Sequence, residues 1–192
     1  KQANIMLAIR PKLHDIDSFL MMPNEKKPTG AVDYNSGVWY WVVTDRAAYY
    51  QKLADMQSGK TGKLVTRLPQ QAAFATDPQD EGRFAGWYQA DWDTSKWKTI
   101  TTAEPFYAQG YSDKTGYPYL GNVWYQFKVD VPKTARGQKV LLYVPVVETE
   151  AWAWVNGKYI GHRPYRESYE RPNEMELDVT DALKPGQTNV IS

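Results

Sequence analysis

The sequence has no cysteine and only two histidines, His14 and His162, which stand far apart in the chain. Disulfide bonds and thiolate chemistry are therefore excluded, and the histidines lack the spacing of a metal site. The sequence thus predicts no zinc-type centre and no catalytic cysteine.

An excess of charge of one sign is also absent, because 23 Lys and Arg stand against 22 Asp and Glu. Such a balance creates no field that would attract nucleic acid or an anionic membrane. No run approaches the roughly 18 apolar residues of a membrane span, and the first residues lack the order of a signal peptide. We expect a neutral or locally recognised partner, with no nucleic acid and no membrane among the partners.

The two ends of the sequence indicate its origin. The chain begins at Lys1 without an initiator Met, and a β-prone run over 189–192 is cut short. We therefore expect a piece of a larger protein, whose missing domains are expected partners. The lack of cysteine suits a cytosolic, periplasmic or secreted protein alike. We expect a secreted or periplasmic location.

What the sequence does contain is apolar and aromatic surface: 42% of its residues are hydrophobic and 14% are aromatic, enough for one good core. Residues 1–43 mix a short apolar run with several Pro and Gly residues. An amphipathic helix is predicted over about 44–58, with Thr44 as its N-cap and Gly59 at its end. Residues 1–63 are thus predicted to be an irregular segment with one helix.

From residue 64 onward the hydrophobic period changes to two, which is typical of strands. Residues 123–131 alternate, with Val123, Tyr125, Phe127, Val129 and Val131 expected on the buried face and Trp124, Gln126, Lys128 and Asp130 on the other. The continuous run 139–147 suits a strand buried on both faces, and 174–179 should direct Met175, Leu177 and Val179 inward. Strands without intervening helices predict an all-β fold, a jelly-roll β-sandwich over 64–192, truncated at its C-terminal end.

A β-hairpin is predicted at "AWAWVNGKYIG", residues 151–161. Asn156-Gly157 is the favoured pair for a type I′ turn, because both central positions need a positive φ. Alternation then places Ala151, Ala153 and Val155 on one face and Trp152 and Trp154 on the other. The two indoles are either covered by a neighbouring segment or exposed for a ligand, and cover is favoured because exposed indoles leave much apolar area in water.

Four stretches of this region carry a resemblance to a known family. They are "AFATDPQDEGRFAGWYQADWDTSKWKTI", "VWYQFKVDVP", "KVLLYVPVVETEAWAWVNGKYIGH" and "NEMELDVTDALKPGQTNVI". In order and spacing they resemble the sugar-binding, galactose-binding-like jelly-roll domain of glycoside hydrolase family 2, which includes β-galactosidases and β-glucuronidases. The resemblance covers about 64–192. Gln126 stands where the family usually carries Arg, so any support that this Arg gives to a neighbouring domain is in doubt.

The resemblance implies that the catalytic glutamates lie on a separate barrel domain, so we expect no catalytic residue in this chain. A carboxylate pair among Asp77, Asp80 and Glu81, or among Glu148, Glu150, Glu167 and Glu170, is the alternative. Solvated loop carboxylates are the favoured interpretation. No cofactor is expected. At "DPQDEG" and "DWD" a structural calcium ion is the alternative to an Asp-stabilised turn, and the turn is favoured.

Two loops, 106–122 and 162–173, interleave Tyr with charged and amide residues. Aromatic planes cover the C–H face of a sugar, and charged or amide groups bind its hydroxyls. An interdomain contact uses the same residue types and is the slightly favoured alternative. The candidate carbohydrate-binding residues are Arg163, Tyr165, Arg166, Glu167, Tyr169 and Glu170, with Tyr111 and Tyr117 from the first loop.

Three functions remain open at this point. The chain is either a non-catalytic carbohydrate-binding or substrate-orienting domain of a larger glycoside hydrolase-like protein, a structural spacer, or an adhesion module. For the first, the expected ligand is a carbohydrate such as a β-linked oligosaccharide.

Overall fold

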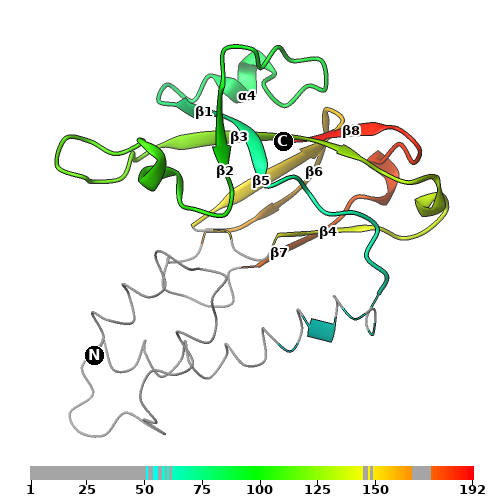
Figure 1. Ribbon diagram of the computed structural model, residues 1–192. Helices are drawn as coiled ribbons and strands as arrows, with labels where there is room; N and C mark the ends of the chain where they lie inside the picture. The colour runs from blue at the N-terminus through cyan, green and yellow to red at the C-terminus, as the bar shows by residue number, and fades with distance from the viewer. Residues whose placement is uncertain are drawn as a thin grey trace, which may run out of the picture.

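The computed structural model describes residues 51, 54, 55, 58, 60, 62–144, 147, 149–165 and 174–192 (Figure 1). These residues form mainly short strands joined by turns and single helical turns. In chain order the elements are β1 (Gln71–Asp77), α4 (Gly82–Ala85), β2 (Lys98–Thr101), η1 (Phe106–Gln109), β3 (Asn122–Asp130), η2 (Lys133–Ala135), β4 (Leu141–Val144), β5 (Ala151–Val155), β6 (Lys158–Arg163), β7 (Met175–Asp178), η3 (Thr180–Ala182) and β8 (Thr188–Ile191).

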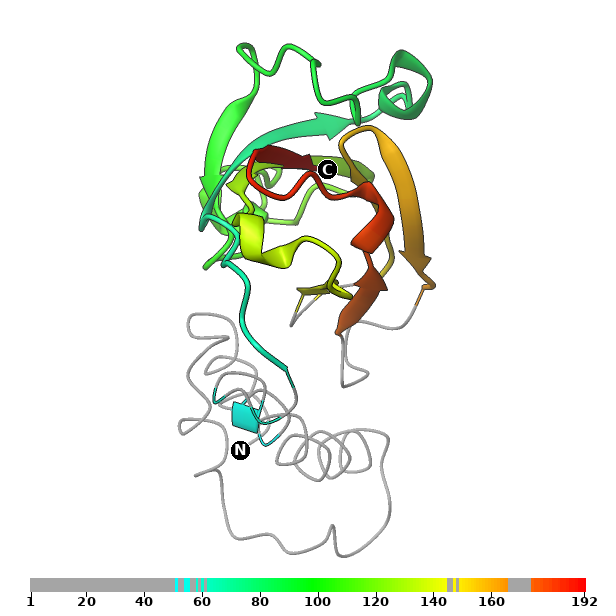
Figure 2. The same cartoon turned by 90° about the vertical axis from the view of Figure 1, so that its right-hand side faces the viewer.

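Two antiparallel sheets make up the described part of the fold. One has six strands in the order β2-β1-β3-β8-β5-β6, and the other pairs β4 with β7. The hydrophobic core lies between them, where Val129, Val155 and Ile191 from the larger sheet meet Leu142 and Met175 from the smaller one. Figures 1 and 2 show β4 and β7 on one side of the larger sheet. The predicted all-β sandwich is confirmed.

The N-terminal part of the prediction falls mostly outside the described residues. Within the expected helix at 44–58, Gln51, Ala54 and Asp55 are helical, and the Ser58 N–H donates to the Ala54 carbonyl at 2.9 Å. The boundary at residue 63 stays a prediction. In the described part of the chain, no helix has the length and apolar character needed to cross a membrane.

On β3, the face expected to lie in solvent is only partly exposed. Lys128 and Asp130 are exposed as predicted, but Trp124 and Gln126 are buried. The prediction for these two residues is wrong because a segment between β1 and β2 covers the outer face there. The Gln126 amide lies 3.4 Å from the carbonyls of both Trp87 and Gln89, and so binds this covering segment.

Asp77 fixes that covering segment. Its Oδ1 accepts the Glu81 N–H at 2.8 Å, and its Oδ2 accepts the Gly82 N–H and the Trp124 indole N–H, both at 2.9 Å. A Cβ at Gly82 would lie 2.5 Å from Trp124 Nε1, so glycine is needed for this close approach. The chain then runs over β1 and β3 on the side away from β4 and β7 (Figure 1).

Strands β7 and β4 test the burial that the pattern of apolar residues predicts. Along β7, Met175 and Val179 at its end are buried and Leu177 packs against the core, as predicted. Burial of both faces of β4 is wrong, because Leu141 is 43% exposed while Leu142 is buried. Within the described residues β4 belongs to a sheet of two strands, which has the core on one face and solvent on the other.

The predicted hairpin is confirmed. Asn156 and Gly157 have φ values of 51° and 82°, as a type I′ turn requires, and β5 pairs with β6. Asn156 also joins the hairpin to the core: its amide donates to the Ala182 carbonyl at 2.8 Å and to Asn189 Oδ1 at 2.7 Å. Asn189 is fully buried.

Replacing Gly157 tests the turn. Gly157→Val should lower the free energy of unfolding by about 1–3 kcal/mol, because a β-branched residue resists positive φ. Its Cβ would also lie 2.6 Å from Gln89 Oε1. Urea unfolding measures the loss. Gly62→Val is the matched control, because an added Cβ there meets nothing within 4 Å; equal stability of the two variants would contradict the turn.

Removing the Asp77 carboxylate tests the covering segment. Asp77→Ala leaves three N–H donors without their acceptor and should cost about 3 kcal/mol or more, with a change in tryptophan fluorescence from Trp124. The exposed Asp93, which accepts one N–H from Ser95 at 2.9 Å, provides the control. If Asp77→Ala and Asp93→Ala unfold at the same urea concentration, the proposed anchor is wrong.

Candidate functional site

The outer face of the β5–β6 hairpin carries the indoles of Trp152 and Trp154, for which cover by a neighbouring segment and exposure to a ligand are the two alternatives. Trp154 is covered: Tyr88 stacks on it with ring centroids 5.3 Å apart and planes 16° apart, and Trp124 lies 5.4 Å away. Trp152 is 42% exposed. Each alternative therefore holds for one residue, because the covering segment reaches Trp154 but leaves much of Trp152 in solvent. Ala153 and Val155 face the core as predicted.

A β-bulge sets which residues of β6 join this face. The pairing register runs Ala153 with Gly161 and then Trp154 with Tyr159, so Ile160 is the extra residue. In a regular strand residues 159 and 162 point to opposite faces. The bulge reverses that parity, and Tyr159 and His162 both lie beside the indoles while Ile160 packs against the core.

Trp152, His162 and Glu150 form a small cluster, named here the Trp152 platform. The His162 ring stacks on the indole at 5.3 Å with planes 14° apart. His162 Nε2 lies 2.6 Å from Glu150 Oε1, and because an ionised carboxylate only accepts, the ring nitrogen donates. Glu150 thus fixes the orientation of the ring beneath an exposed indole.

The predicted site residues of loop 162–173 are only partly described. Arg163 is 6% exposed, and its Nη1 donates to the Thr149 carbonyl at 2.6 Å, which joins the start of β5 to the end of β6. Tyr165 is exposed and follows shortly after the platform in the chain. Arg166, Glu167, Tyr169 and Glu170 lie outside the described residues. Ligand contact by this loop stays a prediction.

The predicted residues of the other loop lie elsewhere. Tyr111 is half-buried with its ring edge-on to Phe74 at 4.6 Å, and Tyr117 is exposed at a turn that Asp113 Oδ1 stabilises. This loop joins β2 to β3, whereas the platform lies on β5 and β6, at the opposite edge of the sheet from β2. No contact in the described structure brings the two sets together.

Two of the carboxylates considered as catalytic or calcium-binding, both in the stretch 77–82, have structural partners. Asp77 accepts three N–H groups, as described above, and Asp80 Oδ1 accepts the Asn122 amide at 2.9 Å. Among the described residues, no group of three His, Asp or Glu side chains could hold a metal ion. The absence of catalytic residues and the calcium alternative both stay predictions.

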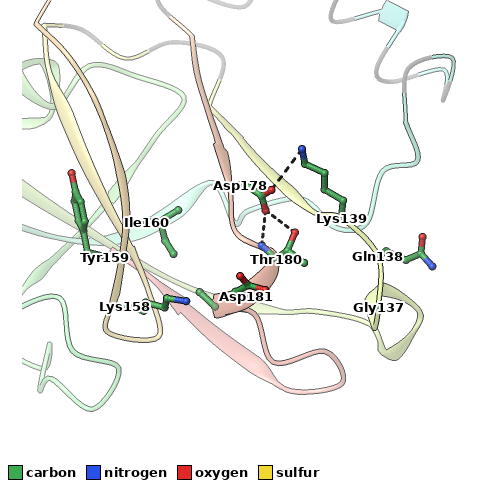
Figure 3. Close-up of a pocket in the computed structure, with 10 residues that line it drawn as sticks. Gly137, Gln138, Lys139, Lys158, Tyr159, Ile160, Asp178, Thr180 and Asp181 are labelled. Atoms are coloured by element: carbon green, nitrogen blue, oxygen red, sulfur yellow. Dashed lines mark hydrogen bonds and ion pairs between the residues drawn. The ribbon is translucent and has the colours of Figure 1, made fainter.

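A cleft of about 520 Å³ opens at the turn end of β6 (Figure 3). Its walls come from three segments: the loop between η2 and β4, the start of β6, and the end of β7 with η3. Two ammonium groups and two carboxylates line it, so its formal charges cancel. The lining residues are Gly137, Gln138, Lys139, Lys158, Tyr159, Ile160, Asp178, Thr180, Asp181 and Ala182.

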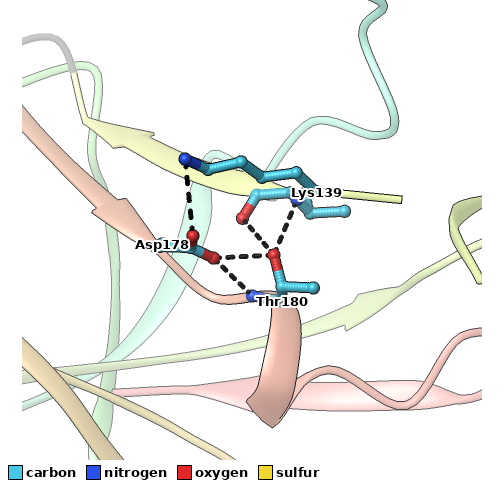
Figure 4. A network of polar contacts seen from close by, with 4 residues as sticks. Lys139, Asp178 and Thr180 are labelled. Atoms are coloured by element: carbon cyan, nitrogen blue, oxygen red, sulfur yellow. Dashed lines mark hydrogen bonds and ion pairs between the residues drawn. The ribbon is translucent and has the colours of Figure 1, made fainter. Parts of the chain in front are cut away.

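A polar network braces one wall of this cleft (Figure 4). Asp178 Oδ1 accepts the hydroxyl of Thr180 at 2.6 Å and its backbone N–H at 3.0 Å, and Lys139 Nζ lies 3.7 Å from Oδ2. The Thr180 hydroxyl in turn accepts the Val140 N–H at 3.0 Å. The hydroxyl and N–H of Thr180, together with Lys139, hold the pKa of the Asp178 carboxyl below its usual value.

Comparison with known structures identifies the fold. No family model matches the sequence. Complexes of a β-glucuronidase from Ruminococcus gnavus with uronic deoxynojirimycin and with D-glucuronic acid each match at a TM-score of 0.55 and 21% identity, over 65% of this chain and 20% of that chain. The apo enzyme gives the same values. The chain has a glycoside hydrolase family 2-like fold. It spans about a fifth of the length of those enzymes.

The Asp178 network predicts a pH effect. Thr180→Val should raise the pKa of Asp178 toward its ordinary value, while Thr180→Ser, which keeps the hydroxyl, should leave the pKa low. Because the folded-state pKa lies below the unfolded one, the network stabilises the fold above the unfolded pKa, and this contribution disappears as the pH falls through the folded value. Carboxyl NMR titration measures the pKa of Asp178, and Asp113, which has its own Thr115 partner, is the internal control. An unchanged Asp178 pKa in Thr180→Val would contradict the assignment.

Proposed function

We propose that this chain is a non-catalytic carbohydrate-binding or substrate-orienting domain of a larger glycoside hydrolase-like protein. The observation that carries the proposal is the Trp152 platform: an exposed indole, stacked on a His ring whose orientation a carboxylate fixes. A sugar has an apolar C–H face and a rim of hydroxyls, so an aromatic plane with hydrogen-bonding groups beside it is the surface that recognises it.

The Trp152 platform also contains a hydrogen-bond acceptor for a sugar hydroxyl. His162 binds one oxygen of Glu150, which leaves the second oxygen to accept a sugar hydroxyl. Tyr165 begins the loop whose residues Arg166, Glu167, Tyr169 and Glu170 we propose as further hydroxyl and ring contacts. Arg163 is buried and binds the Thr149 carbonyl, so we propose that it holds the start of this loop to the start of β5.

The fold likeness supports the parent class. The matched structures are β-glucuronidases with sugar-like ligands, and this chain corresponds to a fifth of their length. We propose that hydrolysis belongs to another domain of the parent protein, which docks on this one, and that the parent is secreted or periplasmic. A spacer or an adhesion module without sugar contact is the competing function.

Sugar titration separates these functions. With methyl β-glucuronide, methyl β-galactoside and methyl β-glucoside as probes, at least one should bind with a dissociation constant of about 1 mM, as expected for one platform with few hydrogen bonds. Trp152→Ala should weaken binding at least tenfold in calorimetry or NMR titration.

Phe84→Ala is the matched control, because Phe84 is 86% exposed on α4 and distant in sequence from the platform. A Tyr165→Ala, Tyr169→Ala double variant tests the loop separately. No binding of any probe at about 20 mM would leave a structural role, and equal losses in Trp152→Ala and Phe84→Ala would remove the platform from the site.

A further inference from the structure

We infer that the hairpin binds a chain of neutral pyranose units rather than a single sugar, along a line from the Trp152 platform over Tyr159 into the cleft between β6, η3 and the η2–β4 loop. This inference rests on the proposed function and extends it to a second subsite and a ligand size. The line of residues is named here the hairpin track.

Tyr159 joins the two ends of the track. Its ring lies 5.5 Å from Trp154 on the outer face, and the same residue lines the cleft. It is 51% exposed, although Trp154 behind it is largely covered. Aromatic pairs thus follow one another along the hairpin, Trp152 with His162 and then Trp154 with Tyr159. Residues two apart on a strand are about 7 Å apart, a step that one elongated ligand spans and a single small sugar does not.

Hydrogen bonds link the walls of the cleft to one another. Asn156 ties the hairpin to the Ala182 carbonyl in the β7–η3 segment. In the same segment, the Val179 N–H donates to the Val140 carbonyl of the η2–β4 loop at 3.0 Å. Asn189, fully buried, accepts from both Asn156 and the Lys184 N–H. A ligand entering such a cleft does not have to order its walls, which lowers the entropic cost of binding.

The chemistry of the cleft favours a neutral, hydroxyl-rich ligand. Asp178 is already engaged by Thr180 and Lys139. The side chains of Gln138, Lys158 and Asp181 have no hydrogen-bond or ion-pair partner among the residues that the structure describes, and line the cleft (Figure 3). They offer an amide, a cation and an anion together, which bind hydroxyls as donors and acceptors. Because the charges cancel, neither an anion nor a cation is selected by the field.

Chain-length dependence is the decisive measurement. Calorimetry compares methyl β-glucoside with cellotetraose, and methyl β-galactoside with β-1,4-galactotetraose, on the full chain. At least one tetrasaccharide should bind ten times more tightly than its monosaccharide, or about 1.4 kcal/mol. In NMR titrations the backbone amides of Gln138, Lys158 and Asp181 should shift with that tetrasaccharide and not with the monosaccharide.

Variants of the lining residues test whether the cleft causes the tighter binding of the tetrasaccharide. The double variant Lys158→Met, Asp181→Asn should reduce tetrasaccharide affinity to the monosaccharide value and leave monosaccharide binding unchanged. Lys128→Met, Asp91→Asn makes the same chemical change at exposed positions outside the cleft and should have no effect. Trp152→Ala should weaken both ligands.

The outcomes distinguish this inference from the proposed function. Monosaccharide binding that depends on Trp152, without a tetrasaccharide gain or with a gain insensitive to the cleft variant, overturns the track and leaves the function standing. Absence of binding by every monosaccharide and tetrasaccharide overturns both.

Discussion

The buried carboxylate of Asp77 is the constraint on which the outer face of the larger sheet depends. By accepting two backbone N–H groups and one indole N–H, it closes the loop after β1 and holds Trp124 against that loop. The chain is thereby directed across β1 and β3, where Trp87 lies between Trp92, Trp97 and Trp124. Tyr88, next to Trp87, then covers Trp154. The exposed part of the hairpin is what this cover does not reach.

Much of the fold could be predicted because it depends on local chemistry. The Asn156-Gly157 turn could be predicted because these two residue types accept the positive φ values that a type I′ turn requires. The inward positions of β7 follow from alternation. The burial of Trp124 and Gln126 could not be predicted in that way. Alternation describes one strand, whereas these residues are covered by a segment some 40 positions earlier, and period-two patterning carries no information about such a layer. The exposure of Leu141 has the same origin, since the number of strands in its sheet is a property of the whole chain.

The candidate site was less accessible to sequence reasoning. Alternation places Trp152 and Trp154 on one face but carries no information about their different surroundings. In the sequence, His162 is an isolated histidine and Glu150 is an acidic loop residue. Gly161 inside a short strand was the available signal, because a glycine there often marks a bulge. The cleft draws on segments separated by some 20 to 40 residues, and no local motif links them.

The extra residue in β6 lets two side chains that are three positions apart share one face of the hairpin. Tyr159 and His162 both lie beside the indoles because the bulge at Ile160 absorbs one position. A related chain with one residue fewer at this point would have the same two rings two positions apart, and a regular strand would then keep them on the same face without a bulge. Such a chain would keep the aromatic surface and lose a residue that packs against the core. A one-residue gap at this point in an alignment is therefore compatible with an unchanged outer surface.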